Sequence, residues 1–203
     1  MKFSPSCFLA TAGIALAMLC VETRAEGRCT GHRLLTTPRL EMSCIDVKPE
    51  VYPSPDRAMR AVVFPVDIDL NATPDMESRV AIRTKEGKLL TSKDFSSPRG
   101  ANGYHVVFAK WSPDSQFFVF SMASSGGHSP WSFPTWVYSR DKNLFVSFSE
   151  MIGNNPTVSE EFKFEGSHVL TALTWEKSGS DNKVPIKVDL EEAMKKLAPA
   201  SKQ

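Results

Sequence analysis

One short turn occurs twice in this chain, and each copy is followed by the same order of segments. Ser54-Pro55-Asp56 and Ser112-Pro113-Asp114 stand 58 residues apart. Proline and aspartate favour a tight turn, because proline fixes one backbone angle and aspartate bonds to nearby backbone amides. After each turn come a strand-like segment, a polar loop, a second strand-like segment, a tight turn and a third. Since another strand-like segment precedes each turn, the pattern predicts units of about four strands.

A third, fainter round follows the first two. Residues 164–168 take the turn position, 169–175 the next strand, 176–183 the polar loop and 184–190 the last strand, but Ser-Pro-Asp is missing. Short runs of β-branched and aromatic residues separated by Gly, Pro, Asn, Asp and Ser are typical of antiparallel strands joined by turns. The predicted strands are 61–70, 79–84, 88–95, 104–111, 116–122, 135–139, 144–150, 160–166, 168–176 and 184–190. The predicted fold class is therefore all-β.

A single helix is predicted, at 189–198, followed by a flexible tail at 199–203. Asp189 is suited to the N-cap, and Glu192 three residues later completes a capping-box pattern. Acidic residues fill the first turn and lysines the last, which suits the helix dipole. The apolar residues fall on one stripe that should pack against a sheet. They are Leu190, Met194 and Leu197.

The second copy of the turn, "WSPDSQFFVFS" at 111–121, resembles the Trp-Ser-Pro-Asp repeat of WD40-like and TolB-type β-propellers. Trp111, the turn and the apolar run 117–120 match that pattern. The resemblance implies that each unit is a propeller-like blade and that Trp111 packs between two blades.

The chain also departs from the propeller pattern. Tyr52 is offset from the tryptophan position in the first copy, and the usual glycine after Asp is replaced by Arg57 and Ser115. Propellers close with 4 to 8 blades, whereas this chain offers about three units. A small incomplete propeller, a ring completed by a second copy, and a sandwich all remain open.

The N-terminal 25 residues have the composition of a secretory signal peptide. Lys2 precedes the apolar run 7–21, and small residues at 23–25 suit cleavage after Ala25. The run is short for a membrane span, which needs about 20 apolar residues, so an anchor helix is the weaker alternative. A lipoprotein signal at Cys20 would want a small residue where Leu19 stands. We therefore expect a periplasmic or secreted bacterial protein with one β-rich domain at 26–198 and no membrane span.

Two of the four cysteines remain after removal of that segment. Cys29 and Cys44 form an even pair in an exported chain, which favours a disulfide. Such a bond would stabilise the fold by about 3 kcal/mol on the chain-entropy model. Two free thiols or a metal pair are the alternatives; His32 is the nearest histidine.

Charge and motifs exclude several function classes. The removed segment holds two of the 24 basic and one of the 23 acidic residues, leaving 22 of each. This balance gives no electrostatic reason for binding nucleic acid. The histidines have no metal-binding spacing, and the chain has neither a GxSxG elbow nor a phosphate-binding glycine loop. We therefore predict no cofactor and no enzymatic activity.

One acidic segment has partial calcium-loop spacing. Oxygen-bearing residues stand at alternate positions of 67–75, as in calcium loops. The candidate ligands are Asp67, Asp69, Asn71 and Asp75. Ala72 and Ser78 occupy the places where an EF-hand has glycine and glutamate. An outward polar strand end is the simpler interpretation, so no metal site is predicted.

The loop at 123–134 is longer than two neighbouring strands require. Loops of about 12 residues without structure are uncommon in compact domains and are often functional. Its contact candidates combine hydroxyls, an imidazole and large aromatic rings: Ser124, Ser125, His128, Trp131 and Phe133. The alternative is that the aromatic residues fold back and cover a sheet.

These observations favour a non-enzymatic exported protein that binds a protein partner through loops on a β-scaffold. An inhibitor or immunity protein is one sub-class, and a secreted hydrolase or toxin of the cell envelope is then the partner. The alternative is a glycan-binding module or enzyme accessory protein of the cell envelope, with Trp131 and Trp136 stacking on sugar rings.

Overall fold

The computed structural model describes residues 48–66, 77–98, 102–127, 131–176 and 181–197. Several sequence-based predictions lie outside these residues. They are the signal peptide at 1–25, the Cys29–Cys44 disulfide, the weak calcium candidates Asp67, Asp69, Asn71 and Asp75, His128, and the tail at 199–203. Neither helix in the described part is long and apolar enough to cross a membrane.

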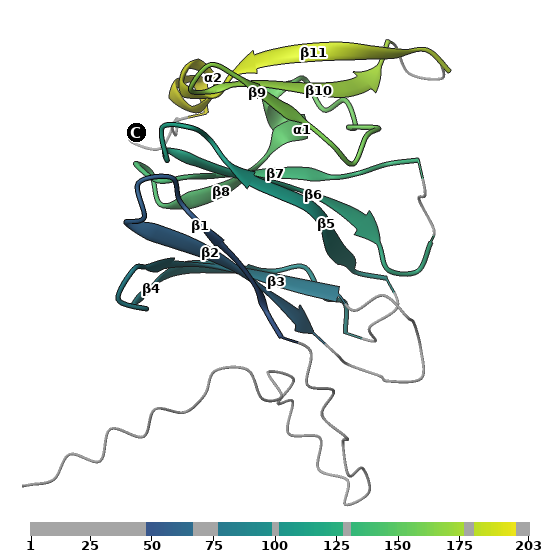
Figure 1. Ribbon diagram of the computed structural model, residues 1–203. Coiled ribbons are helices and arrows are strands. Elements are labelled where there is room, and N and C mark those ends of the chain that lie inside the picture. Colours follow the sequence, from purple (N-terminus) through teal and green to yellow (C-terminus); the bar gives the residue numbers. More distant parts are fainter. Residues whose placement is uncertain (1–47, 67–76, 99–101, 128–130, 177–180, 198–203) are drawn as a thin grey trace, which may run out of the picture.

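Three antiparallel sheets stack as layers, with the second sheet in the middle (Figure 1). Consecutive strands pair within each sheet, so each sheet is a meander. The first contains β1 (Glu50–Pro53), β2 (Met59–Val66), β3 (Glu77–Thr84) and β4 (Leu89–Asp94). The second contains β5 (Tyr104–Trp111), β6 (Phe117–Ser124), β7 (Thr135–Ser139) and β8 (Leu144–Ser147). The third contains β9 (Lys163–Glu165), β10 (Val169–Trp175) and β11 (Lys183–Asp189). No described strand closes a sheet into a barrel.

The first Ser-Pro-Asp turn joins β1 to β2 through hydrogen bonds of its own residues. The Ser54 amide donates to Met59 O at 2.9 Å, and the Met59 amide donates to Ser54 Oγ at 3.0 Å. The Ser54 hydroxyl lies 2.6 Å from Asp56 Oδ1. Arg57 adopts a positive φ of 58°, the left-handed conformation that glycine adopts without steric cost.

The second turn repeats this pattern between β5 and β6. The Ser112 amide donates to Phe117 O at 2.8 Å, and the Phe117 amide donates to Ser112 Oγ at 2.9 Å. Ser115 has a φ of 65°, like Arg57 at the matching position. The Asp56 amide donates to Ser115 Oγ at 3.0 Å. The two turns are therefore alike in structure and also hydrogen-bonded to each other.

Replacing Arg57 with glycine is expected to stabilise the fold by about 0.5–1 kcal/mol. The left-handed conformation costs a non-glycine residue roughly 1–2 kcal/mol. The greater backbone freedom of glycine in the unfolded chain offsets part of this gain. Ser115→Gly is the matched comparison. It removes the acceptor for the Asp56 amide, so no gain is expected there. Urea unfolding of both variants tests this, and a less stable Arg57→Gly protein would contradict it.

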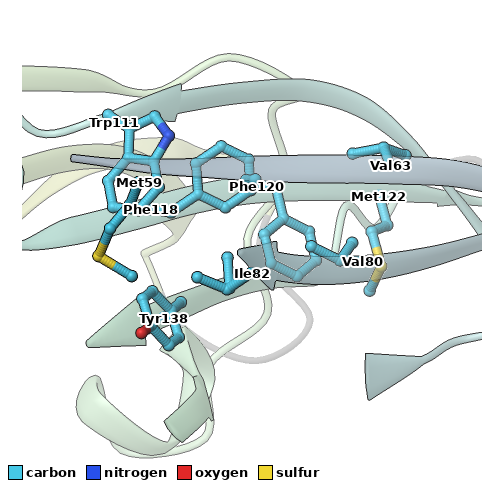
Figure 2. Packing of buried hydrophobic residues seen from close by; sticks show 10 residues of the cluster. Met59, Val63, Val80, Ile82, Trp111, Phe118, Phe120, Met122 and Tyr138 are labelled. Carbon is cyan, nitrogen blue, oxygen red and sulfur yellow. The ribbon is translucent and has the colours of Figure 1, made fainter. Parts of the chain in front are cut away.

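An aromatic core fills the space between the first and second sheets. Figure 2 shows Phe118, Phe120 and Tyr138 of the second sheet facing Met59 and Ile82 of the first. All five are nearly or fully buried. The described core also contains Trp111, which lies between the same two sheets. Trp111 therefore packs between the first and second sheets.

A second core lies between the second and third sheets and the helices. Phe117 and Val119 of β6 pack there with Leu170 of β10 and with Leu190 and Met194. Successive residues of β6 therefore face two different cores. Because both faces of this strand are buried, its sequence is a continuous apolar run instead of an alternating one.

The helix α2 (Leu190–Lys196) begins where the capping pattern predicts. The side chain of Asp189 accepts a hydrogen bond from the Glu192 amide at 3.1 Å. Leu190 and Met194 are buried, as expected for the apolar stripe. Leu197 is wrongly assigned to that stripe: it is the C-cap and is 39% exposed.

Two other predictions are corrected by the structure. The strand predicted at 144–150 ends at Ser147, and α1 (Phe148–Met151) follows as one helical turn. This turn directs Phe148 into the second core, where it is fully buried; burying such a ring contributes about 1.5–3 kcal/mol. The third unit has three described strands and not four. Where a fourth would pair, Thr157 makes only an isolated bridge with Thr174.

Candidate binding loop between β6 and β7

The loop that leaves β6 and returns in β7 lies at the end of the sheets opposite the Ser-Pro-Asp turns (Figure 1). The structure describes its outgoing arm, 124–127, and its returning arm, 131–134. Trp131 is 60% exposed, more than any other large hydrophobic side chain in the described residues. The loop therefore presents a large aromatic surface to solvent.

The outgoing arm is fixed by a buried carboxylate. Ser125 is buried, and its hydroxyl donates to Glu77 Oε1 at 2.8 Å. Its amide donates to Gly103 O at 3.0 Å. Glu77 begins β3 and Gly103 precedes β5, so this arm is attached to the first sheet as well as to its own.

Glu77 itself is held by several donors. The amides of Ser97 and Gly103 each donate to it at 2.5 Å, and the Ser97 hydroxyl lies 2.9 Å from Oε1. A Cβ atom added at Gly103 would lie 2.4 Å from Glu77 Cδ. Since a buried carboxylate is costly unless it is hydrogen-bonded, these donors let Glu77 stay only 1% exposed.

The returning arm is fixed from the third sheet. The Phe133 amide donates to Thr157 O at 3.0 Å, and the Thr157 hydroxyl bonds to Phe133 O. The hydroxyls of Thr135 and Thr157 lie 3.0 Å apart. Thr157 is in turn bridged to Thr174 of β10. The two arms are thus attached to different neighbouring sheets, while Trp131, the first residue of the returning arm, stays exposed.

The candidates for contact with a partner have different environments. Trp131 is exposed, Ser124 and Phe133 are half-buried, and Ser125 is in the interior. His128 lies outside the described residues. Ser125 therefore shapes the loop through Glu77 and presents no hydroxyl at the surface. Sequence reasoning missed Glu77, because its donors come from positions 20 to 48 residues away.

Trp136, the second ring proposed for glycan stacking, is packed in the structure. The Phe95 ring lies against it, edge on, with ring centroids 5.4 Å apart. Lys93 Nζ lies 4.1 Å from its ring centroid, within cation–π range. Trp131 is therefore the exposed ring of the pair. Among the described residues, the cluster of side chains that could bind a metal ion is not in this loop but around His168.

Comparison with known proteins gives no family. No family model matches the chain, and no curated protein matches it. Among solved structures, a eukaryotic initiation factor is similar with a TM-score of 0.34 and 10% identity, over 75% of this chain and 32% of the other. A puromycin hydrolase mutant is similar with a TM-score of 0.29 and 10% identity, over 73% of this chain and 28% of the other. The chain thus spans about a third of the length of the structures it matches.

Proposed function

We propose that this protein is a non-enzymatic, exported scaffold that binds a protein partner of the cell envelope through the β6–β7 loop. Its three sheets act as propeller-like blades, and the loop acts as an inhibitory or immunity element toward a secreted hydrolase or toxin. The signal-like segment at 1–25 supports export, and a cysteine pair in the remaining chain is consistent with an oxidising compartment.

The observation that carries this proposal is an exposed tryptophan in a loop whose two arms are hydrogen-bonded to neighbouring sheets. Trp131 is 60% exposed, although burying an aromatic ring is favourable. Tryptophan is enriched among the residues that dominate binding energy at protein interfaces. Because Ser125 and Phe133 are hydrogen-bonded to neighbouring sheets, these arms lose little conformational freedom when a partner binds. Such preorganisation increases affinity.

The same contacts favour a protein partner over a glycan. The glycan alternative rested on two stacking rings, and Lys93 and Phe95 pack against one of them, Trp136. A reaction at Ser125 is also disfavoured, since its hydroxyl is buried and donates to a carboxylate instead of a histidine.

Truncating the exposed ring is expected to weaken partner binding by about 30-fold or more, since an interface hot spot is worth at least about 2 kcal/mol. The variant is Trp131→Ala, and the ligand is a purified secreted hydrolase of the cell envelope, recovered from an envelope extract together with the unmodified protein. Affinity is measured by calorimetric titration and inhibition by substrate turnover. Because the ring is exposed, the stability of the variant should stay within about 0.5 kcal/mol of the original.

Leu89→Ala is the matched control. Leu89 is also a large exposed hydrophobic residue, with 48% of its surface exposed. It begins β4, at the end of the sheets opposite the β6–β7 loop. It should bind like the unmodified protein. Equal affinity of the Trp131→Ala variant would reject the loop as the contact surface. Binding of peptidoglycan fragments that depends on Trp131, without hydrolase binding, would favour the glycan-binding alternative.

A further inference from the structure

Three metal-ligating side chains meet at the end of the molecule opposite the β6–β7 loop. Asp114 belongs to the β5–β6 turn, His168 precedes β10, and Glu191 lies in the first turn of α2. His168 Nδ1 lies 3.8 Å from Asp114 Oδ2 and 3.9 Å from Glu191 Oε1. All three ligand atoms lie within 4.8 Å of one another.

Hydrogen bonds of the fold place two of these residues next to the cluster before any ligand is considered. Asp114 Oδ1 lies 2.5 Å from the Ser112 hydroxyl and accepts from the Gln116 amide at 3.1 Å. The turn therefore uses one oxygen of Asp114, and the other, Oδ2, is the one nearer to His168. The carbonyl of His168 accepts a hydrogen bond from the Leu190 amide at 3.1 Å, which sets the start of α2 beside it.

The second ring nitrogen of His168 faces another carboxylate. His168 Nε2 lies 3.4 Å from Asp189 Oδ2. A metal-binding imidazole almost always directs its other N–H to a carboxylate, carbonyl or water, which fixes its tautomer and orientation. With the proton on Nε2, Nδ1 carries a lone pair toward two carboxylates. The lone pair and the carboxylate oxygens then repel each other, unless a cation or a further proton lies between the ring nitrogen and the carboxylates.

Comparison of the two Ser-Pro-Asp turns shows what is different here. In the first turn, the corresponding oxygen Asp56 Oδ2 accepts from Arg140 Nη1 at 2.6 Å. Hydrogen bonds from Ser54 and Arg140 hold the pKa of Asp56 well below its usual range. In the second turn the Asp114–His168 separation of 3.8 Å is too long for a direct hydrogen bond.

The same separation suits two ligands of one metal ion. Zinc lies about 2.0–2.2 Å from nitrogen and oxygen ligands, so two ligands in tetrahedral geometry stand about 3.4 Å apart. Small rotations of Asp114 and Glu191, which are partly exposed, would close the difference. The charge agrees with this: three carboxylates surround one imidazole, and no described Lys or Arg forms an ion pair with Asp114, Asp189 or Glu191. Lys195, on the same helix, bonds to Glu192, and its charge acts on Glu191 and Asp189 only from a longer distance.

We propose that Asp114, His168 and Glu191 bind a divalent transition-metal ion of the zinc type, with Asp189 orienting the imidazole and water completing the coordination. The ion joins the second sheet to the third sheet and α2. It acts as a structural clamp at this end of the molecule, independently of the proposed loop function.

The test uses the full chain without a purification tag, freed of metal by chelation. This protein is titrated with zinc chloride in a calorimeter. One saturating site per chain is expected, together with a higher melting temperature, because a ligand that binds only the folded state stabilises it. His168→Gln and Glu191→Gln should each abolish that site. Asp189→Asn should weaken it by about 10- to 100-fold, as loss of an orienting partner does, while asparagine still caps the helix.

Glu192→Gln is the matched control, since Glu192 stands beside Glu191 in the same helical turn but is not a ligand. It should bind zinc like the unmodified chain. Cobalt titration gives a second measurement: a tetrahedral absorption spectrum that is lost in His168→Gln. The proposal is overturned if the chain has no saturating zinc site. It is equally overturned if His168→Gln and Glu191→Gln bind as tightly as Glu192→Gln.

Discussion

Replacing Trp111 with alanine is expected to lower the free energy of unfolding by about 3–5 kcal/mol, the range for truncation of a buried tryptophan. Its side chain is 5% exposed and lies between the first and second sheets. Its ring centroid is 5.3 Å from that of Phe118 and 6.3 Å from that of Tyr138. Its Nε1 donates to Tyr52 O at 2.8 Å. Alanine would leave a cavity between the sheets and a carbonyl without its donor.

Urea unfolding followed by far-ultraviolet circular dichroism measures this change, because removal of a tryptophan disturbs fluorescence. Trp111→Phe separates the two contributions: it keeps most of the apolar volume and loses the hydrogen bond, so it should cost less than alanine. Trp131→Ala is the exposed control. If Trp111→Ala lowers the free energy of unfolding by less than about 1 kcal/mol, the residue behaves like an ordinary surface position. That result would contradict its role between the sheets.

Gly103→Ala is expected to destabilise the protein by about 3 kcal/mol, at the upper end of the usual overpacking range. The added Cβ would stand 2.4 Å from Glu77 Cδ and 2.6 Å from both carboxylate oxygens. Glu77 cannot move away easily, because Ser97, Ser125 and Gly103 itself all donate to it. The glycine is needed for close approach, since an ordinary side chain would fill the space of the carboxylate.

Gly127→Ala is the matched control for crowding. Gly127 has a φ of 66°, but nothing lies within 4 Å of its added Cβ, so only the backbone cost of about 1–2 kcal/mol is expected. A Gly103→Ala and Glu77→Ala double variant should lose less than the sum of the single changes, because the shorter side chain makes room for the methyl group. Additive losses in urea unfolding, or equal losses at the two glycines, would contradict a direct clash.

Local sequence was sufficient for most of the strands. The strands predicted at 104–111 and 135–139 coincide with β5 and β7, because their residues and flanking turns carry the whole signal. The same is true of the Asp189 cap on α2, whose hydrogen bond spans three residues. The strand predicted at 144–150 failed at Phe148 for the opposite reason. Its local preference for a strand was overridden by burial in a core whose residues come from distant parts of the chain.

The candidate site was only partly predictable. Loop length and the aromatic residues indicated the β6–β7 loop, and Trp131 is exposed there. Ser125 looked equally available in the sequence, yet it is buried against Glu77, 48 residues earlier in the chain. The cluster around His168 was also missed, since its partner Asp114 stands in the turn of a different sheet.

The sequence by itself determined the two Ser-Pro-Asp turns and the capped helix, because the hydrogen bonds that define turns and caps join residues within about five positions. Only the tertiary structure decided which side chains stay exposed and which meet. The sheets stack through Trp111, Glu77 draws its donors from separate loops, and His168 is placed beside Asp114. Those contacts depend on how the sheets pack, and no spacing along the chain encodes them.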